Sequence, residues 1–247
     1  MRSNLLLTVL RSRPAALATL ALSAMAVSAH ATPINVGDFS ATSSSSYQLN
    51  NGIYTHGANL NNWTNAYGAY NFVFVPGDTS ATSQYGSLSL YHNPTSPKAG
   101  NYVGLDSDYG QGAISETLKG LVAGDLVTLN FDFAGAQQTG FSGASTDYLA
   151  VSLGGQTIDT QTLHNPSNGF TGWNSESLTF TATGSSEVLS FLAVGTPSGV
   201  PSFALLDNVS GTQTPPNSPV PEPASLALLA TGLAGLGGLV RSRFSKA

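Results

Sequence analysis

The histidines and acids of this chain form no pattern typical of a catalytic or metal centre. The chain has no cysteine, which excludes disulfides, thiolate metal sites and cysteine nucleophiles. Its histidines lack metal-ligand spacing such as H-x-x-x-H, and no G-x-S-x-G elbow or glycine-rich phosphate loop is present. The closest carboxylates, Asp106 and Asp108, stand two apart, so on a strand they would point the same way and bind a cation or water. A glycan hydrolase needs a pair of carboxylates on either side of the bond that it cleaves, so this function is less favoured than a non-catalytic one.

Four aromatic residues are candidates for binding sugar rings. Trp63, Tyr67 and Tyr70 lie in or just after an asparagine-rich stretch at 59–65, which is too polar for a core strand, and Trp173 follows a glycine-bounded segment. Aromatic faces stack on the C–H faces of sugars while nearby amides bind hydroxyl groups. The alternative is that these side chains close the ends of the hydrophobic core. Both interpretations remain open at this stage.

One acid is predicted to lie among apolar side chains. Asp207 alternates with Phe203, Leu205 and Val209, so all four would share one face of a strand. A carboxylate in that position requires a cation or several hydrogen bonds, because an unpaired buried charge is very unfavourable. Either a calcium ion or backbone N–H groups near a strand end would meet this requirement.

The elements that position these residues are predicted to be β-strands. In Leu126–Phe133 the residues Val127, Leu129, Phe131 and Phe133 fall on one face, and Asp147–Leu153 and the pair Leu178 and Phe180 repeat this alternation. Further predicted strands are Phe72–Val75, Leu88–Tyr91, Tyr102–Leu105, Ala113–Leu118, Val188–Val194 and Phe203–Val209. Glycine-, proline- and aspartate-rich turns separate them. Many short strands without an amphipathic helix indicate a sandwich or a barrel.

The charges of the chain are segregated. Six of the eight Lys and Arg residues lie in the first 13 or the last seven positions. Between residues 14 and 240 only Lys98 and Lys119 stand against all 13 acids, so this span has a net charge of −11. Such a domain cannot neutralise a phosphate backbone, which excludes nucleic acid as a partner. Calcium or neutral sugars suit it better.

The N-terminus has the three parts of a secretory signal peptide. Arginines precede an apolar run from Ala15 to Val27, and Ala29-His30-Ala31 supplies the cleavage site. We predict that residues 1–31 are removed after Ala31. An uncleaved anchor is the alternative, but 13 apolar residues are few for a membrane span of about 20.

The C-terminus combines a short motif, an apolar run and a basic end. A proline-rich linker at 212–220 leads to Pro221-Glu222-Pro223, then to an apolar run at 224–240, then to Arg241 and Arg243. A helix over 224–240 would be about 25 Å long, the short end of a membrane span, and the arginines would hold its end in the cytoplasm.

Residues 221–247 resemble the PEP-CTERM sorting signal of exopolysaccharide-producing Gram-negative bacteria. The resemblance implies processing by exosortase, a membrane cysteine transpeptidase that cuts near the Pro-Glu-Pro. It assigns recognition to Pro221, Glu222 and Pro223, and topology to Arg241 and Arg243. A permanent membrane anchor is the alternative, and in both cases the folded domain lies outside the cytoplasm.

The central region, 32–211, resembles the jelly-roll modules of the carbohydrate-binding, galactose-binding-like group. The segment Gly100–Phe133, the first-strand motif at 36–39 and the last-strand motif at 203–209 carry the resemblance. It implies a two-sheet antiparallel jelly roll, and one structural Ca²⁺ between Asp38 and Asp207. The sequence therefore predicts an exported, non-catalytic protein of the cell surface or exopolysaccharide matrix, whose jelly roll binds glycans or is structural.

Overall fold

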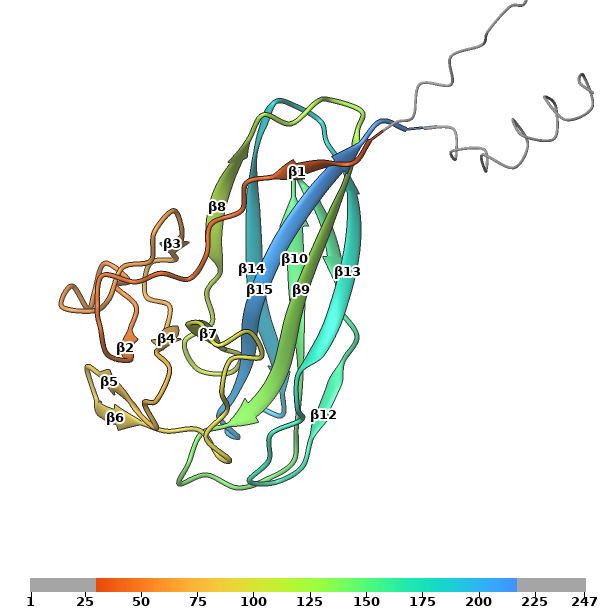
Figure 1. Ribbon diagram of the computed structural model, residues 1–247. Coiled ribbons are helices and arrows are strands. Elements are labelled where there is room, and N and C mark those ends of the chain that lie inside the picture. Colours follow the sequence, from red (N-terminus) through yellow and green to blue (C-terminus); the bar gives the residue numbers. More distant parts are fainter. Residues whose placement is uncertain (1–29, 217–247) are drawn as a thin grey trace, which may run out of the picture. The chain divides into compact units, whose positions relative to one another are not determined.

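Residues 30–216 form a two-sheet β-sandwich without a helix in the computed structural model (Figure 1). Within these residues the larger sheet has nine strands and the smaller sheet has six. The structure describes residues 30–216 only, so the helices predicted for the signal peptide and for 224–240 lie outside the described residues. Among those described, no helix is long and apolar enough to cross a membrane.

The strands of the larger sheet are β1 (Thr32–Ile34), β2 (Tyr47–Gln48), β4 (Phe72–Phe74), β5 (Ala81–Ser83), β6 (Gly86–Leu88), β7 (Tyr102–Asp106), β9 (Leu126–Gln137), β13 (Asn174–Thr181) and β15 (Ser202–Thr214). Those of the smaller sheet are β3 (Thr64–Asn65), β8 (Ile114–Lys119), β10 (Ser145–Leu153), β11 (Gln156–Asp159), β12 (Leu163–Asn165) and β14 (Ser186–Thr196). The larger sheet has the order β13-β9-β15-β7-β4-β2-β5-β6, with β1 also paired to β15. The smaller sheet has the order β11-β10-β14-β8-β3, with β12 paired to β10. The predicted all-β sandwich is thus confirmed. Its strand pairs are antiparallel except β2 and β5, which pair in parallel at Tyr47 and Thr82.

The main hydrophobic core lies between the two sheets. Alternate residues of β9, including Val127, Leu129 and Phe131, face alternate residues of β10 and β14, and all are buried. This is the expected result of period-two alternation on two sheets that pack face to face.

A second cluster covers the outer face of the larger sheet, so part of this sheet is buried on both sides. Its buried members are Phe72, Phe74, Ala81, Leu88, Leu90, Tyr102, Ala134, Ala136, Phe203 and Leu205. A chain segment that follows β6 lies over this cluster: Tyr102 donates its hydroxyl hydrogen to the Pro94 carbonyl at 2.8 Å. The double burial explains why β9 reads as continuously apolar or small after Phe133.

Two details correct the expectations from sequence. The predicted strand Leu88–Tyr91 is replaced by β6, which ends at Leu88, and by an isolated bridge between Leu90 and Gln138. In β15 the register shifts between Asp207 and Ser210, where Asn208 has a φ of 54°. A one-residue bulge moves the following side chain to the other face, so Val209 packs on the inter-sheet core instead of sharing a face with Phe203.

Both ends of the described domain lie at the same end of the sandwich (Figure 1). The first strand, β1, pairs antiparallel with the end of β15, with Thr32 opposite Gln213 and Ile34 opposite Gly211. At the other end of β15, Ser202 pairs with Gln137 and Phe203 with Asp106. The last strand therefore runs the full length of the larger sheet.

Candidate functional site

Exposed aromatic side chains gather in one cleft at the start of β15. The cleft has a volume of about 440 Å³, and its lining residues are Gly68, Tyr70, Gln84, Tyr85, Asp106, Tyr109, Gly110, Gln138, Phe141 and Pro201. Four aromatic residues of the described domain are exposed: Tyr67, Tyr85, Tyr109 and Phe141. Three of them line this cleft, and the fourth adjoins Gly68. We call this feature the aromatic cleft.

Strand pairing brings the walls of the aromatic cleft together from distant parts of the sequence. Tyr85 lies in the turn between β5 and β6, Tyr109 follows β7, and Phe141 follows β9. Because β7 and β9 both pair with β15, their final residues Asp106 and Gln137 lie beside Phe203 and Ser202. The loops that follow these strands consequently meet at one end of the sheet.

Tyr70 forms the inner wall of the aromatic cleft. Its ring packs edge-on against Phe72, with centroids 4.7 Å apart, and lies 5.8 Å from the ring of Tyr85. Its hydroxyl group bonds to Ser83 Oγ at 3.1 Å. Burial raises the pKa of Tyr70, so its hydroxyl is neutral and able to donate.

Asp106 provides a fixed carboxylate in the wall of the same cleft. Its Oδ1 accepts the backbone N–H groups of Asp108 at 2.8 Å and Tyr109 at 3.1 Å, and its Oδ2 accepts that of Gly110 at 3.0 Å. The residue is 2% exposed. Burial raises the pKa of Asp106, whereas these three hydrogen bonds oppose the rise by stabilising the charged form.

The aromatic residues predicted from sequence occupy different environments. Trp63 is a core residue: it is 5% exposed, its ring lies between Phe39 and Phe191, and its Nε1–H donates to the Gly37 carbonyl at 3.0 Å. This placement favours the alternative that Trp63 closes the core over the expectation that its ring stacks on a sugar. Tyr67 is 81% exposed and lies against Gly52, outside the lining of the aromatic cleft.

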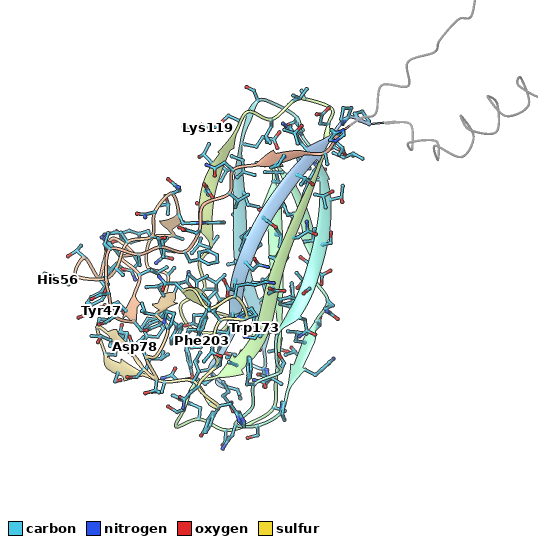
Figure 2. The ribbon with its side chains drawn as sticks, viewed as in Figure 1. Tyr47, His56, Asp78, Lys119, Trp173 and Phe203 are labelled. Carbon is cyan, nitrogen blue, oxygen red and sulfur yellow. The ribbon has the colours of Figure 1, made fainter. Side chains whose placement is uncertain are left out.

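Trp173 is half-buried and helps to cover the second cluster. It packs against the cluster that includes Phe203, and Figure 2 labels both residues. Its ring meets Tyr102 edge-on at 5.6 Å, and its Nε1–H donates to the Thr95 carbonyl at 2.8 Å. Of the four predicted aromatics, only Tyr70 lines the aromatic cleft.

Sequence reasoning missed Tyr85, Tyr109 and Phe141, although a local signal exists. Each stands beside glycine in a polar segment: Gln84-Tyr85-Gly86, Asp108-Tyr109-Gly110 and Gly140-Phe141. Gly86 and Gly140 have φ values of 117° and 90°, which residues with a side chain rarely adopt. Tyr85 and Phe141 therefore each stand next to a tight turn. An aromatic residue on such a turn lacks neighbours that could bury it.

The two acids predicted to hold calcium line one pocket of about 430 Å³. Asp38 is exposed, and Asp207 is 5% exposed. Asp207 accepts hydrogen bonds from Ser96 Oγ at 2.5 Å and from the Asn208 N–H at 2.6 Å. Burial raises the pKa of Asp207, and the positive charge of Lys98, which lines the same pocket, lowers it.

The pocket offers oxygen ligands but also contains its own cation. Calcium requires about six to eight oxygens, and residues 30–216 contain no group of three or more His, Asp or Glu side chains placed to hold a metal. Calcium thus remains a prediction. If calcium is bound, EDTA should lower the thermal midpoint of unfolding of the wild type and leave that of Asp207→Asn unchanged. An unaltered midpoint of the wild type would contradict the calcium site.

Comparisons with known proteins concern the fold and the C-terminal tail. The domain resembles the EclA C-terminal domain, a sugar-binding protein, at 22% identity over 39% of this chain and 64% of that chain (TM-score 0.30). It also resembles TmCBM61 in complex with β-1,4-galactotriose, at 15% identity over 60% of this chain and 86% of that chain (TM-score 0.34). A third similar structure is the CBM22-1 xylan-binding domain of Paenibacillus barcinonensis Xyn10C, at 11% identity over 74% of this chain and 99% of that chain (TM-score 0.34). No curated protein sequence matches the chain.

The C-terminal tail matches the model of a protein family. The predicted sorting residues, from Pro221 to Arg243, lie outside the described residues, but their sequence falls within a family match at 219–243. The family is the PEP-CTERM protein-sorting motif. The chain therefore carries a sorting motif that marks an exported protein for the cell surface or the extracellular space.

Proposed function

We propose that this protein is an exported, exosortase-processed protein of the cell surface or exopolysaccharide matrix, whose β-sandwich binds glycans without cleaving them. The observation that carries the glycan-binding part is the aromatic cleft, where three of the four exposed aromatic residues of the described domain line one hollow. Single exposed aromatic residues are common on protein surfaces, whereas several that converge on one hollow favour a binding role.

The chemistry of the aromatic cleft suits a sugar chain. The rings of Tyr85, Tyr109 and Phe141 can stack on C–H faces, while the side-chain amides of Gln84 and Gln138 can donate to and accept from hydroxyl groups. A few polar groups between aromatic walls fix the orientation of a ligand.

The acids of the aromatic cleft favour binding over hydrolysis. Glycoside cleavage needs one carboxylic acid free to donate a proton and a second carboxylate to act on the other side of the bond. Asp106 uses both of its oxygens to accept backbone N–H groups, and the neighbouring Asp108 accepts the Gly199 N–H at 2.8 Å. A secreted glycan hydrolase is the alternative function, and release of reducing ends from a bound polysaccharide distinguishes the two.

Single aromatic substitutions test the cleft. We expect Tyr85→Ala and Tyr109→Ala each to weaken polysaccharide binding by roughly tenfold or more, as for a stacking anchor. Affinity gel electrophoresis of the mature protein in the producing strain's own exopolysaccharide measures the change. Tyr148→Ala is the matched control, because Tyr148 lies on β10 of the smaller sheet. Equal retention of all variants would remove the cleft as the binding site.

The sorting part is tested on the tail itself. Replacing Pro221-Glu222-Pro223 with three alanines is expected to block exosortase processing, so that the product keeps the mass of residues 224–247 and stays with the membrane. Intact-mass measurement and cell fractionation provide the readout, with alanines at Pro215 and Pro216 as the control. If the wild type and the variant both keep the mass of residues 224–247, the C-terminus is instead a permanent anchor.

A further inference from the structure

The aromatic cleft contains charge of only one sign. No Lys, Arg or His lines it, whereas Asp106 does. The only Lys and Arg residues within 30–216 are Lys98 and Lys119. Lys98 lines the pocket of Asp38 and Asp207, and Lys119 lies at the end of β8, well away from the β5–β6 turn in Figure 2. No cation of the described domain is therefore placed to neutralise an acid in the cleft.

The negative charge cannot move away from a ligand. Three backbone N–H groups hold the Asp106 carboxylate, and the residue is almost fully buried. A second acid, Asp108, is fixed close by through the Gly199 N–H. The charge of Asp108 adds to burial in raising the pKa of Asp106, whose side chain is almost completely removed from solvent. Charges in such surroundings are screened much less than charges in open solvent.

From this arrangement we infer that the aromatic cleft selects uncharged polysaccharide and rejects chains that carry uronate or sulfate groups. The inference rests on the proposed glycan-binding function and adds the chemical class of the ligand. A neutral sugar places no charge beside Asp106, whereas an anionic sugar brings a like charge into a site without a compensating cation. Rejection by an unpaired like charge is an effective source of specificity.

Matched pairs of polysaccharides test the selection. The mature protein is run in affinity gels that contain hydroxyethylcellulose or carboxymethylcellulose, dextran or dextran sulfate, and methyl-esterified pectin or the same pectin after de-esterification. Within any pair that binds, we expect the uncharged member to bind at least tenfold more tightly. Sodium chloride should reduce this preference only in part, because Asp106 is buried.

Two variants separate the local charge from the charge of the whole domain. Asp108→Asn keeps an acceptor for the Gly199 N–H, and we expect it to reduce the preference several-fold. Asp159→Asn removes the same charge from an exposed position on β11 of the smaller sheet, and it should leave the preference unchanged. Equal effects of the two variants would overturn the inference.

The outcomes also distinguish this inference from the proposed function. Tighter or equal binding of the anionic members overturns the charge selection and leaves glycan binding intact. Retention by no polysaccharide, the strain's own included, overturns glycan binding and the selection with it. Preference for the uncharged members, together with weaker binding of those members by Tyr85→Ala, supports both.

Discussion

The β-sandwich is expected to be more stable at pH 5 than at pH 7.5, by roughly 1 kcal/mol from Asp147 alone. Asp147 is fully buried; its Oδ1 accepts the Ser107 hydroxyl at 2.5 Å, and its Oδ2 has no hydrogen-bond partner. Burial raises the pKa of Asp147 from 3.8 to about 6. Only the interval of about one pH unit between pH 5 and this pKa contributes, and one unit corresponds to roughly 1.4 kcal/mol.

The direction of this change in stability with pH follows from proton binding by Asp147 in the folded and unfolded states. Between pH 3.8 and about 6 the folded state holds a proton on Asp147 that the unfolded chain has released. Unfolding then releases a proton, so the free energy of unfolding falls as the pH rises through this window and levels off above it. Burial also raises the pKa values of Asp106, Glu116 and Asp207, which act in the same direction.

Urea denaturation at several pH values measures the effect. Asp147→Asn removes the titrating group and should flatten the curve, while the exposed Asp159→Asn controls for the loss of one carboxylate. A wild-type domain that is more stable at pH 7.5 than at pH 5 would show that Asp147 is ionised in the folded state and compensated.

Trp63→Ala is expected to destabilise the domain by about 3–5 kcal/mol, the usual cost of truncating a large buried aromatic residue. The ring of Trp63 packs between Phe39 at 5.5 Å and Phe191 at 5.9 Å, and the substitution also leaves the Gly37 carbonyl without its donor. Trp63→Phe keeps most of the apolar contact and loses the N–H, so its cost should be clearly smaller. Chemical denaturation at fixed pH gives both values.

Binding measurements on the same variants decide between a core role and a sugar-binding role. Folded Trp63→Phe should bind polysaccharide as the wild type does, because Trp63 does not line the aromatic cleft. Weaker binding at unchanged stability would contradict the core role and restore the prediction made from sequence.

Period-two alternation predicted the long strands well because their side chains meet the inter-sheet core. The predicted starts of β9, β10, β14 and β15 lie within two residues of the observed ones, but the predictions stop four residues before the end of β9 and five before the end of β15. The two- and three-residue strands β2, β3 and β5 were not predicted, since so short a run has no detectable period. Their pairing depends on contacts between distant residues, such as Thr64 opposite Ser115.

The binding surface was harder to predict than the fold. The asparagine-rich setting of Trp63 suggested exposure, yet the chain turns at Asn62, which has a φ of 67°, and the indole enters the core. Tyr85, Tyr109 and Phe141 are separated by 24 and 32 positions, and only the order of strands in the sheet brings their turns together. Local sequence identifies an exposed aromatic, whereas topology decides which aromatics share a surface.

The path of β15 gives the domain a mechanical axis. The strand begins beside Pro201 in the wall of the aromatic cleft and ends at Thr214, five positions in the sequence before the match to the sorting motif begins at residue 219. A pull on a ligand held in the cleft, resisted at the C-terminus, would load this one strand along its length. β9 and β7 flank it with antiparallel ladders, so the load falls on many hydrogen bonds in shear at once. A domain that is held at its C-terminus would therefore resist opening from one end.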